Sequence, residues 1–370
     1  MYGAELYFDS APCYSSIQVS MKEVAKILKK QWVLIGFGWA SLGVFTSSAH
    51  PTILTINVPE VCKQALDTSM LNALKKLQAF TRNQHASWPS QYLKQDSFPT
   101  VDAEDFALTR ILTNADIKTE TIAAMSRLAT SDPKASALWN MYFRSYDQAM
   151  LYSGGFHELY ALVQHYIPAS AKTIADVGVG TANFSALLAN LRPHASLEMI
   201  DFSDSGLAMA RAKIIELNGV GSDSAHQFIQ QDLRNVSELP KTPLDAAVIN
   251  NVLYNFNRDE KKAILKWLFD RLPSKGVIVV GDPKQEVLTD PRNKVKFSRD
   301  VLRSAVQNKS PANDFDIALI VYINQVITGQ SAEFLNVEQY SLLFTEIGFR
   351  ILGVGSSYHD ASNVFVLEKP

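Results

Sequence analysis

The chain has 370 residues, 47% hydrophobic and 19% charged, a composition typical of a globular protein with room for two domains. The formal net charge of −2 excludes a general electrostatic attraction to nucleic acid or to an anionic membrane. The two cysteines, Cys13 and Cys62, form neither a disulfide framework nor a metal-ligand pattern, and we expect no metal site.

Residues 1–57 are basic at first and then apolar. Four lysines between positions 22 and 30 precede the uncharged run 32–45, and small residues follow it at 46–49. This order resembles a secretory signal, and the run extended to Ile56 is long enough for a membrane anchor. Three glycines within the run fit a buried hairpin or core helix equally well. Both interpretations stay open.

Residues 58–150 show the spacing of amphipathic helices. One apolar stripe comprises Val61, Ala65, Met70, Leu74 and Leu77, and two more lie near 106–112 and 122–128. We expect this helical region to cover a ligand pocket as a lid or to mediate homodimerisation.

A buried strand around 174–179 leads directly into a glycine turn. Gly178 and Gly180 permit positive φ and a close approach of a ligand to the backbone. Thr181 is expected to open a helix that runs from Ala182 to Leu191, whose free N–H groups face the turn. This arrangement predicts a nucleotide-cofactor site.

Four further strands are predicted, and each ends in a polar residue. The strands are 197–200, 226–231, 246–249 and 276–281, followed by Asp201, Asp232, Asn250 and Asp282. In a parallel sheet these ends converge on one crevice, where ligands bind. Asp201 has a plainer alternative as a helix N-cap, although Ser203 or Asp204 would serve equally well.

From about residue 141 to 370 these motifs together resemble a class I S-adenosylmethionine-dependent methyltransferase. The family's first motif, an acid followed by glycine-x-glycine, is matched by Asp176, Gly178 and Gly180, while Ala182 stands where a third glycine is usual. The resemblance implies an α/β fold with a doubly wound, seven-stranded, mostly parallel sheet over 151–370. Segments 351–354 and 363–367 resemble its closing antiparallel hairpin, after a last helix at 338–349.

The resemblance also implies a cofactor site for S-adenosylmethionine. The acid Asp176 and the glycine turn would hold the methionine end, and Asp201 would bind the ribose. Phe202 would lie beside the adenine, which Asp232 and the Leu233 amide would contact. The cofactor-binding prediction therefore comprises Asp176, Gly178, Gly180, Thr181, Asp201, Phe202, Asp232, Leu233 and Asn250.

Two other functions compete with this interpretation. A dinucleotide oxidoreductase needs a small residue at the third position of glycine-x-glycine-x-x-glycine, where this chain has Asn183. A non-catalytic cofactor-binding or scaffold protein is suggested by Tyr254, which stands where related O-methyltransferases have a histidine base. Tyrosine has an ordinary pKa of about 10 and is a poor base at neutral pH.

The acceptor is expected to be a small molecule that is methylated on oxygen. The fourth strand lacks the Asn/Asp-Pro-Pro-aromatic motif of nucleobase and glutamine methyltransferases, which together with the charge argues against nucleic acid. Tyr254 is interpreted as a pocket wall, so that the acceptor needs no base or a base comes from His157, His165 or Asp282. Tyr146, Tyr152 and Phe156 are expected to form an aromatic lid, and the insertion 285–336, with an apolar helix at 317–327, a cap.

We expect a cytoplasmic protein, because the cofactor is made and held in the cytosol. If residues 30–57 are an anchor, the protein would contact a membrane through its N-terminus.

Overall fold

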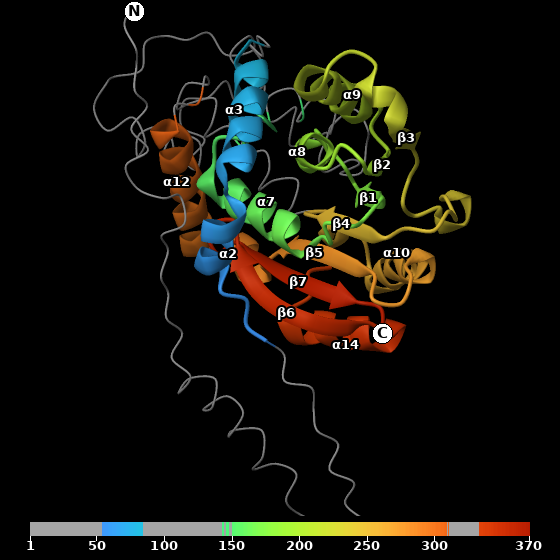
Figure 1. Cartoon of the computed structure of the whole chain (residues 1–370). Coiled ribbons are helices and arrows are strands. Elements are labelled where there is room, and N and C mark those ends of the chain that lie inside the picture. Colours follow the sequence, from blue (N-terminus) through green and yellow to red (C-terminus); the bar gives the residue numbers. More distant parts are fainter. Residues whose placement is uncertain (1–53, 84–142, 144–145, 148–149, 309, 311–332) are drawn as a thin grey trace, which may run out of the picture.

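The computed structural model describes residues 54–83, 143, 146–147, 150–308, 310 and 333–370. Its centre is a seven-stranded sheet with the order β3-β2-β1-β4-β5-β7-β6 (Figure 1). The strands are β1 (Thr173–Val177), β2 (Ser196–Asp201), β3 (Gln227–Gln230), β4 (Ala246–Asn250), β5 (Val277–Pro283), β6 (Arg350–Ser357) and β7 (Ser362–Glu368). The predicted α/β fold is therefore confirmed.

Strands β1 to β5 are parallel, and β7 pairs antiparallel with both β5 and β6. The predicted closing hairpin is thus present. The strand order reverses between β1, which leads to β2, and its other neighbour β4. In open α/β sheets a ligand crevice lies outside the carboxyl ends of the strands at such a reversal.

Helices cover both faces of the sheet, because successive strand residues point to opposite sides. Ile174 packs in one core cluster with residues of α2, α7, α8 and α9, whereas Ala175 packs in the other with α10 and α14. The helices are α2 (Val58–Ala65), α3 (Thr68–Asn83), α7 (Gly154–Tyr166), α8 (Asn183–Leu191), α9 (Asp204–Asn218), α10 (Arg258–Arg271), α11 (Gln285–Thr289), α12 (Pro291–Gln307) and α14 (Val337–Ile347). Short 3-10 turns lie at Ser222–Ala225, Val236–Glu238 and Leu253–Asn255.

The first predicted helical stripe belongs to two helices rather than one. Helix α2 ends at Ala65 and α3 begins at Thr68 after a cap at Asp67, whose carboxylate accepts from Met70 N (2.8 Å). All five predicted stripe residues are buried. Helix α3 contacts α8 and α9, so the stripe packs against the sheet domain.

Residues 54–56 continue the sheet as an extended segment beside β6. Thr55 bridges Val354 in parallel, Ile56 N donates to Val354 O (2.8 Å), and Ile56 packs against Gly353 and Gly355. The last residues of the apolar span, if it extends to Ile56, therefore pair with a strand, and the rest of that span lies outside the described residues.

Other predictions fall outside the described residues. They concern the apolar run 32–45, the stripes near 106–112 and 122–128, and the helix 317–327. Within the described residues, no helix has both the length and the apolar character needed to cross a membrane.

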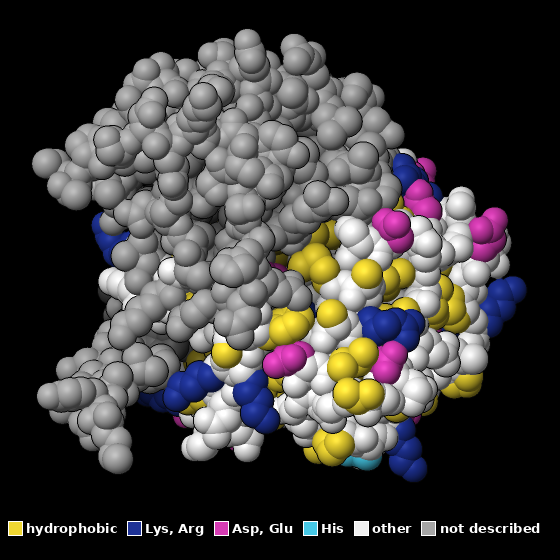
Figure 2. Space-filling model, turned by 90° about the horizontal axis from the view of Figure 1, so that it is seen from above, with side chains coloured by type: hydrophobic (Ala, Val, Ile, Leu, Met, Phe, Trp, Pro, Cys, Tyr) yellow, Lys and Arg dark blue, Asp and Glu magenta, His cyan; other side chains and the backbone are white. Residues whose placement is uncertain are grey.

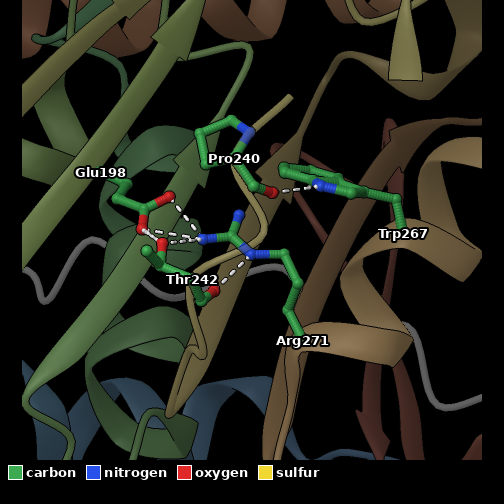
Figure 3. A network of polar contacts seen from close by, with 5 residues as sticks. All are labelled: Glu198, Pro240, Thr242, Trp267 and Arg271. Carbon is green, nitrogen blue, oxygen red and sulfur yellow. Dashed lines mark hydrogen bonds and ion pairs between the residues drawn. The ribbon is translucent and has the colours of Figure 1, made fainter. Parts of the chain in front are cut away.

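A buried ion pair joins β2 to α10 (Figure 3). Arg271 Nη2 donates to both carboxylate oxygens of Glu198 (2.8 and 2.7 Å), and its Nε donates to Thr242 O (2.7 Å). Both side chains are almost completely buried, with exposed fractions of 3% and 1%. Arg271 and Glu198 therefore join the two elements without lining the crevice.

Candidate active site

The structure brings all nine predicted cofactor-binding residues to one cavity at the carboxyl ends of the parallel strands. They come from the glycine turn after β1, from the ends of β2 and β4, and from the residue pair after β3. The strand order reverses between β1 and β4, and this reversal leaves a crevice at the carboxyl ends of the strands. A single cavity therefore collects residues that are up to 74 positions apart, from Asp176 to Asn250.

The glycine turn is held in a left-handed conformation and bonded to β2. Gly178 and Gly180 have φ values of 68° and 52°, and Gly178 N donates to Ile200 O (2.8 Å). A Cβ atom at position 178 would overlap the side chain of Val252, which follows β4. Glycine is therefore required at 178 both by the backbone and by contact with the neighbouring loop.

Helix α8 begins later than predicted. Its first residue is Asn183, and Ala182 stands before it with φ 60° and ψ 34°. Thr181 does not cap the helix, because its hydroxyl donates to Asp147 (2.7 Å) instead. Ala182, at the place of the usual third glycine, thus takes a left-handed conformation that glycine would adopt at lower energy.

Two buried carboxylates flank the turn. Asp176 accepts from Ser185 Oγ (2.7 Å), and burial raises its pKa to about 7. Asp201 accepts from Gly180 N (2.8 Å) and Ser203 N (2.8 Å), and burial raises its pKa to about 6. Ser203, whose Oγ accepts from Gly206 N (3.0 Å), caps α9, so the N-cap alternative for Asp201 does not hold.

The end of β3 carries a cation that sequence reasoning missed. Arg234 Nε donates to both oxygens of Asp232 (2.9 Å each), and both residues line the cavity with Leu233 and Phe202. The pairing takes place over two residues of one loop, so it could have been recognised from the spacing. Asp232 is therefore already neutralised locally by Arg234.

Asn250 presents an amide without a partner. Both its Oδ1 and its Nδ2 are buried and make no hydrogen bond with the described residues, although Asn250 lines the cavity. Buried amides are normally hydrogen-bonded, and an exception at a cavity points to a ligand. The Asn250 amide can both donate and accept.

An aromatic wall runs along the cavity from the glycine turn to the turn between β6 and β7. It consists of five rings in successive contact: Phe143, Tyr146, Phe156, Tyr358 and Phe297. The ring centroids of Phe156 and Tyr358 are 4.7 Å apart, in an edge-to-face arrangement. All five line the cavity.

Two of the three residues predicted to form an aromatic lid line the cavity. Tyr146 and Phe156 belong to the wall, but Tyr152 is fully buried and donates its hydroxyl to Gln78 O (2.7 Å). Phe143, Phe297 and Tyr358 were missed, because their segments are far apart in sequence and show no joint pattern. Val287 and Phe297 place part of the 285–336 insertion at the cavity.

The three proposed bases lie away from the cavity lining. His157 is buried, its Nε2 donates to Leu151 O (3.1 Å), and burial lowers its pKa to about 4. His165 is exposed on α7. Asp282 accepts from Tyr254 N (3.1 Å) and from the Tyr340 hydroxyl (2.6 Å), and burial raises its pKa to about 7.

Tyr254 does line the cavity, as the wall prediction states. Burial, with a smaller effect of nearby Asp282, raises its pKa above the ordinary value of 10, so that it stays protonated at neutral pH. Tyr254 therefore acts as a donor or a wall and not as a base. Among the described residues, no group of three His, Cys, Asp or Glu side chains converges in the way a metal site requires.

Comparison with known proteins gives a family match over the centre of the chain. Residues 174–276 match the family described as "Methyltransferase domain". No curated protein matches the chain.

Several solved structures are similar in fold. An O-methyltransferase family protein from Burkholderia thailandensis is 13% identical, with a TM-score of 0.45 over 64% of this chain, which spans 60% of that protein's length. Magnesium protoporphyrin IX methyltransferase from Synechocystis PCC 6803 is 16% identical, with a TM-score of 0.41 over 62% of this chain and 86% of that one. The N-methyltransferase NodS from Bradyrhizobium japonicum WM9 is 14% identical, with a TM-score of 0.40 over 59% of this chain and 89% of that one.

The family match runs from β1 through α10 and ends just before β5, and it includes the glycine turn and the acids at and after the ends of β2 and β3. The sheet has the seven strands, the parallel part and the closing antiparallel hairpin that the resemblance implied. Residues 174–276 therefore form the central part of a methyltransferase domain of the class I, S-adenosylmethionine-dependent type.

Proposed function

We propose that this protein transfers a methyl group from S-adenosylmethionine to a hydroxyl oxygen of a small, uncharged, aromatic acceptor. The observation that carries this proposal is the aromatic wall, which continues beyond the glycine turn toward β5 and the β6–β7 turn. Aromatic rings bind planar apolar molecules by edge and face contacts. The part of the cavity beside β5 and the β6–β7 turn is thus the acceptor part, and the part beside β1, β2, β3 and Asn250 is the cofactor part.

The described residues fit the cofactor chemically. Asp201 lies at the end of β2 with a carboxylate that can accept further bonds from a ribose diol. The unpartnered Asn250 amide and the buried acid Asp176 suit the charged groups of an amino acid. Tyr146 and Phe156 offer ring faces or edges to a sulfonium, an attraction worth about 0.5 to 2 kcal/mol. These four contributions together match S-adenosylmethionine better than a dinucleotide.

The protein's part in the reaction is alignment. When bound, the cofactor supplies an electrophilic methyl group on a sulfonium. The chain must hold the acceptor oxygen in line with that group and exclude water, which can contribute roughly 7 to 11 kcal/mol. The wall residues from Phe143 to Phe297 suit this task, because they shape an apolar surface next to the glycine turn.

The state of Tyr254 restricts the acceptor further. A general base is needed only where the acceptor proton has a high pKa, and Tyr254 remains protonated. We therefore expect a phenol-like hydroxyl, whose pKa of about 10 is far below that of an alkyl alcohol. Such an acceptor releases its proton to solvent without a dedicated base.

The charge distribution favours a small molecule over a polyanion. Arg234 is the one cation among the described lining residues, and it is paired with Asp232. Figure 2 shows Lys and Arg side chains beside Asp and Glu side chains on the described part of one face. Interspersed charges of this kind do not concentrate the field that nucleic acid binding uses.

The test uses the full chain and methyl-labelled S-adenosylmethionine with a mixture of simple phenols and, separately, a metabolite extract. We expect a labelled product of low molecular mass, and at least tenfold less of it with Asp201→Ala. The matched control is Asp204→Ala, an exposed acid at the start of α9, which should leave the yield within twofold. Label found in protein or nucleic acid, or equal yields from Asp201→Ala and wild type, would contradict the proposal.

A second candidate function is favoured by Tyr254 itself. A non-catalytic S-adenosylmethionine-binding protein would need no base at that position, and the three other proposed bases do not line the cavity. Calorimetry separates the two functions. Binding of S-adenosylhomocysteine without product from any acceptor mixture would support the non-catalytic function, whereas binding with turnover would reject it.

A further inference from the structure

Asp147 and Lys213 form a buried ion pair directly behind the glycine turn. Their side chains are only 6% and 1% exposed, and Lys213 comes from α9 while Asp147 comes from the helical residues that precede α7. Neither residue carries a role in the site described above. A buried charge pair of this kind is costly to form unless its remaining hydrogen bonds are satisfied.

Both members of the pair form hydrogen bonds with the same two residues of the turn. Asp147 Oδ1 accepts from Thr181 Oγ1 (2.7 Å) and from Asn183 Nδ2 (3.0 Å). Lys213 Nζ donates to Thr181 O (2.6 Å) and to Asn183 Oδ1 (2.7 Å). Each charged group therefore contacts both Thr181 and Asn183, the residues on either side of the left-handed Ala182.

The ion pair also connects the turn to the aromatic wall. Phe143 and Tyr146 lie on the same helical stretch as Asp147 and line the cavity, as do Thr181 and Asn183. The Phe143 ring faces the turn, since a Cβ atom at Gly180 would lie 3.4 Å from its Cε1. Asp147 thus links one side of the cavity to the other through hydrogen bonds between buried side chains.

Stability alone is a weak explanation for this arrangement. Replacing a buried ion pair by apolar residues of similar size is often neutral or stabilising. The same fold contains a second buried pair, Arg271 with Glu198, which bond to each other and to Thr242 (Figure 3). None of these three residues lines the cavity. The two pairs therefore allow a structural role to be separated from a role in ligand binding.

We propose that Asp147 and Lys213 are positioning residues that hold the glycine turn and the Phe143–Tyr146 side of the wall in the geometry that binds the cofactor. This inference rests on the proposed cofactor site. Neither residue touches the cofactor in this scheme, and both act through Thr181 and Asn183. Loss of either contact set would let the turn and the wall move relative to each other.

The test compares Asp147→Asn and Lys213→Met with Glu198→Gln and Arg271→Met, in the full chain. Melting temperature without ligand and the dissociation constant of S-adenosylhomocysteine are measured for each folded variant. We expect all four to melt at lower temperature. Only Asp147→Asn and Lys213→Met should bind S-adenosylhomocysteine at least tenfold more weakly, while the other two stay within twofold of wild type.

Two further variants keep the test decisive if a single substitution does not fold. The double variant Asp147→Leu/Lys213→Met removes both charges together and should fold, yet bind at least tenfold more weakly. Lys213→Arg keeps the charge but not the compact three-donor geometry, and should bind three- to tenfold more weakly. Unchanged binding in these variants, or equal weakening in the Glu198 and Arg271 variants, would overturn the inference.

Failure of the proposed cofactor site gives a different result. In that case the wild-type protein itself shows no binding of S-adenosylhomocysteine. Binding by wild type together with unchanged binding by the Asp147 and Lys213 variants overturns only the positioning role.

Discussion

Gly178 packs against the side chain of Val252: a Cβ atom at position 178 would overlap Cγ2 of Val252 and lie 2.8 Å from its Cγ1. The turn after β1 and the loop after β4 are thus in direct contact at the strand reversal, where the cavity opens. This contact makes the position sensitive to a single methyl group.

Gly178→Ala should destabilise the protein by roughly 1 to 3 kcal/mol, because it combines overpacking with a left-handed backbone. Val252→Ala should restore part of that loss, since the obstructing atoms belong to the Val252 side chain. Gly219→Ala is the control: its φ is 95°, but nothing lies within 4 Å of the added Cβ. Urea unfolding of wild type, Gly178→Ala, Gly178→Ala/Val252→Ala and Gly219→Ala measures these differences. If the double variant is no more stable than Gly178→Ala, the contact with Val252 is not the cause of the loss.

Asp176→Asn should raise stability at high pH and weaken ligand binding. The pKa of Asp176 is raised from 3.8 to about 7 by burial, so the native state binds more protons than the unfolded state between pH 4 and 7. The contribution of this carboxyl to stability therefore falls as pH rises through that window. Asparagine does not titrate, and the variant should gain roughly 4 kcal/mol over wild type at pH 8, the linkage value for a pKa raised from 3.8 to about 7.

The pH series supplies the check on this sign. The stability advantage of Asp176→Asn should shrink as the pH falls to 4, where the wild-type carboxyl is protonated. S-Adenosylhomocysteine should bind wild type more tightly above pH 7 than below it, because the ionised carboxylate attracts an ammonium group. A constant stability difference from pH 4 to 8 would show that this carboxyl does not titrate in the native state as stated.

Ala182→Gly should stabilise the protein by about 0.5 to 1 kcal/mol. The left-handed conformation at φ 60° costs alanine roughly 1 to 2 kcal/mol relative to glycine, and the extra freedom of glycine in the unfolded chain offsets part of this. Ala186→Gly, within α8, is the opposite case and should cost about 1 kcal/mol. Thermal unfolding of both variants tests the contrast, and destabilisation by both would contradict it.

Gly155→Ala should destabilise the protein, and shortening the neighbouring side chain of Tyr358 should not restore the lost stability. A Cβ atom there would lie 2.7 Å from Cα of Tyr358, a backbone atom, within a turn where Tyr358, His359 and Asp360 all have positive φ. The expected loss is roughly 1 to 3 kcal/mol. The double variant Gly155→Ala/Tyr358→Ala should be no more stable than Gly155→Ala, in contrast to the pair at 178 and 252, and recovery in urea unfolding would contradict this.

Local patterns in the sequence were sufficient for the parallel sheet and for the cofactor part of the cavity. Apolar strands ending in Asp201, Asp232 and Asn250 can be recognised because strand periodicity and glycine turns act over a few residues. The nine predicted residues consequently lie at one cavity. The start of α8 was misplaced, because the Thr181 hydroxyl bonds to Asp147, 34 positions away, rather than to its own helix.

The sequence by itself determined the order of the elements and the residue types that face the crevice, because both follow from short-range hydrophobic spacing and backbone freedom. Only the tertiary structure decided that Phe143, Phe297 and Tyr358 form one wall, and that Asp147 meets Lys213 behind the glycine turn. These contacts join segments far apart in the chain. Their energy depends on distance and burial in three dimensions, which no local pattern records.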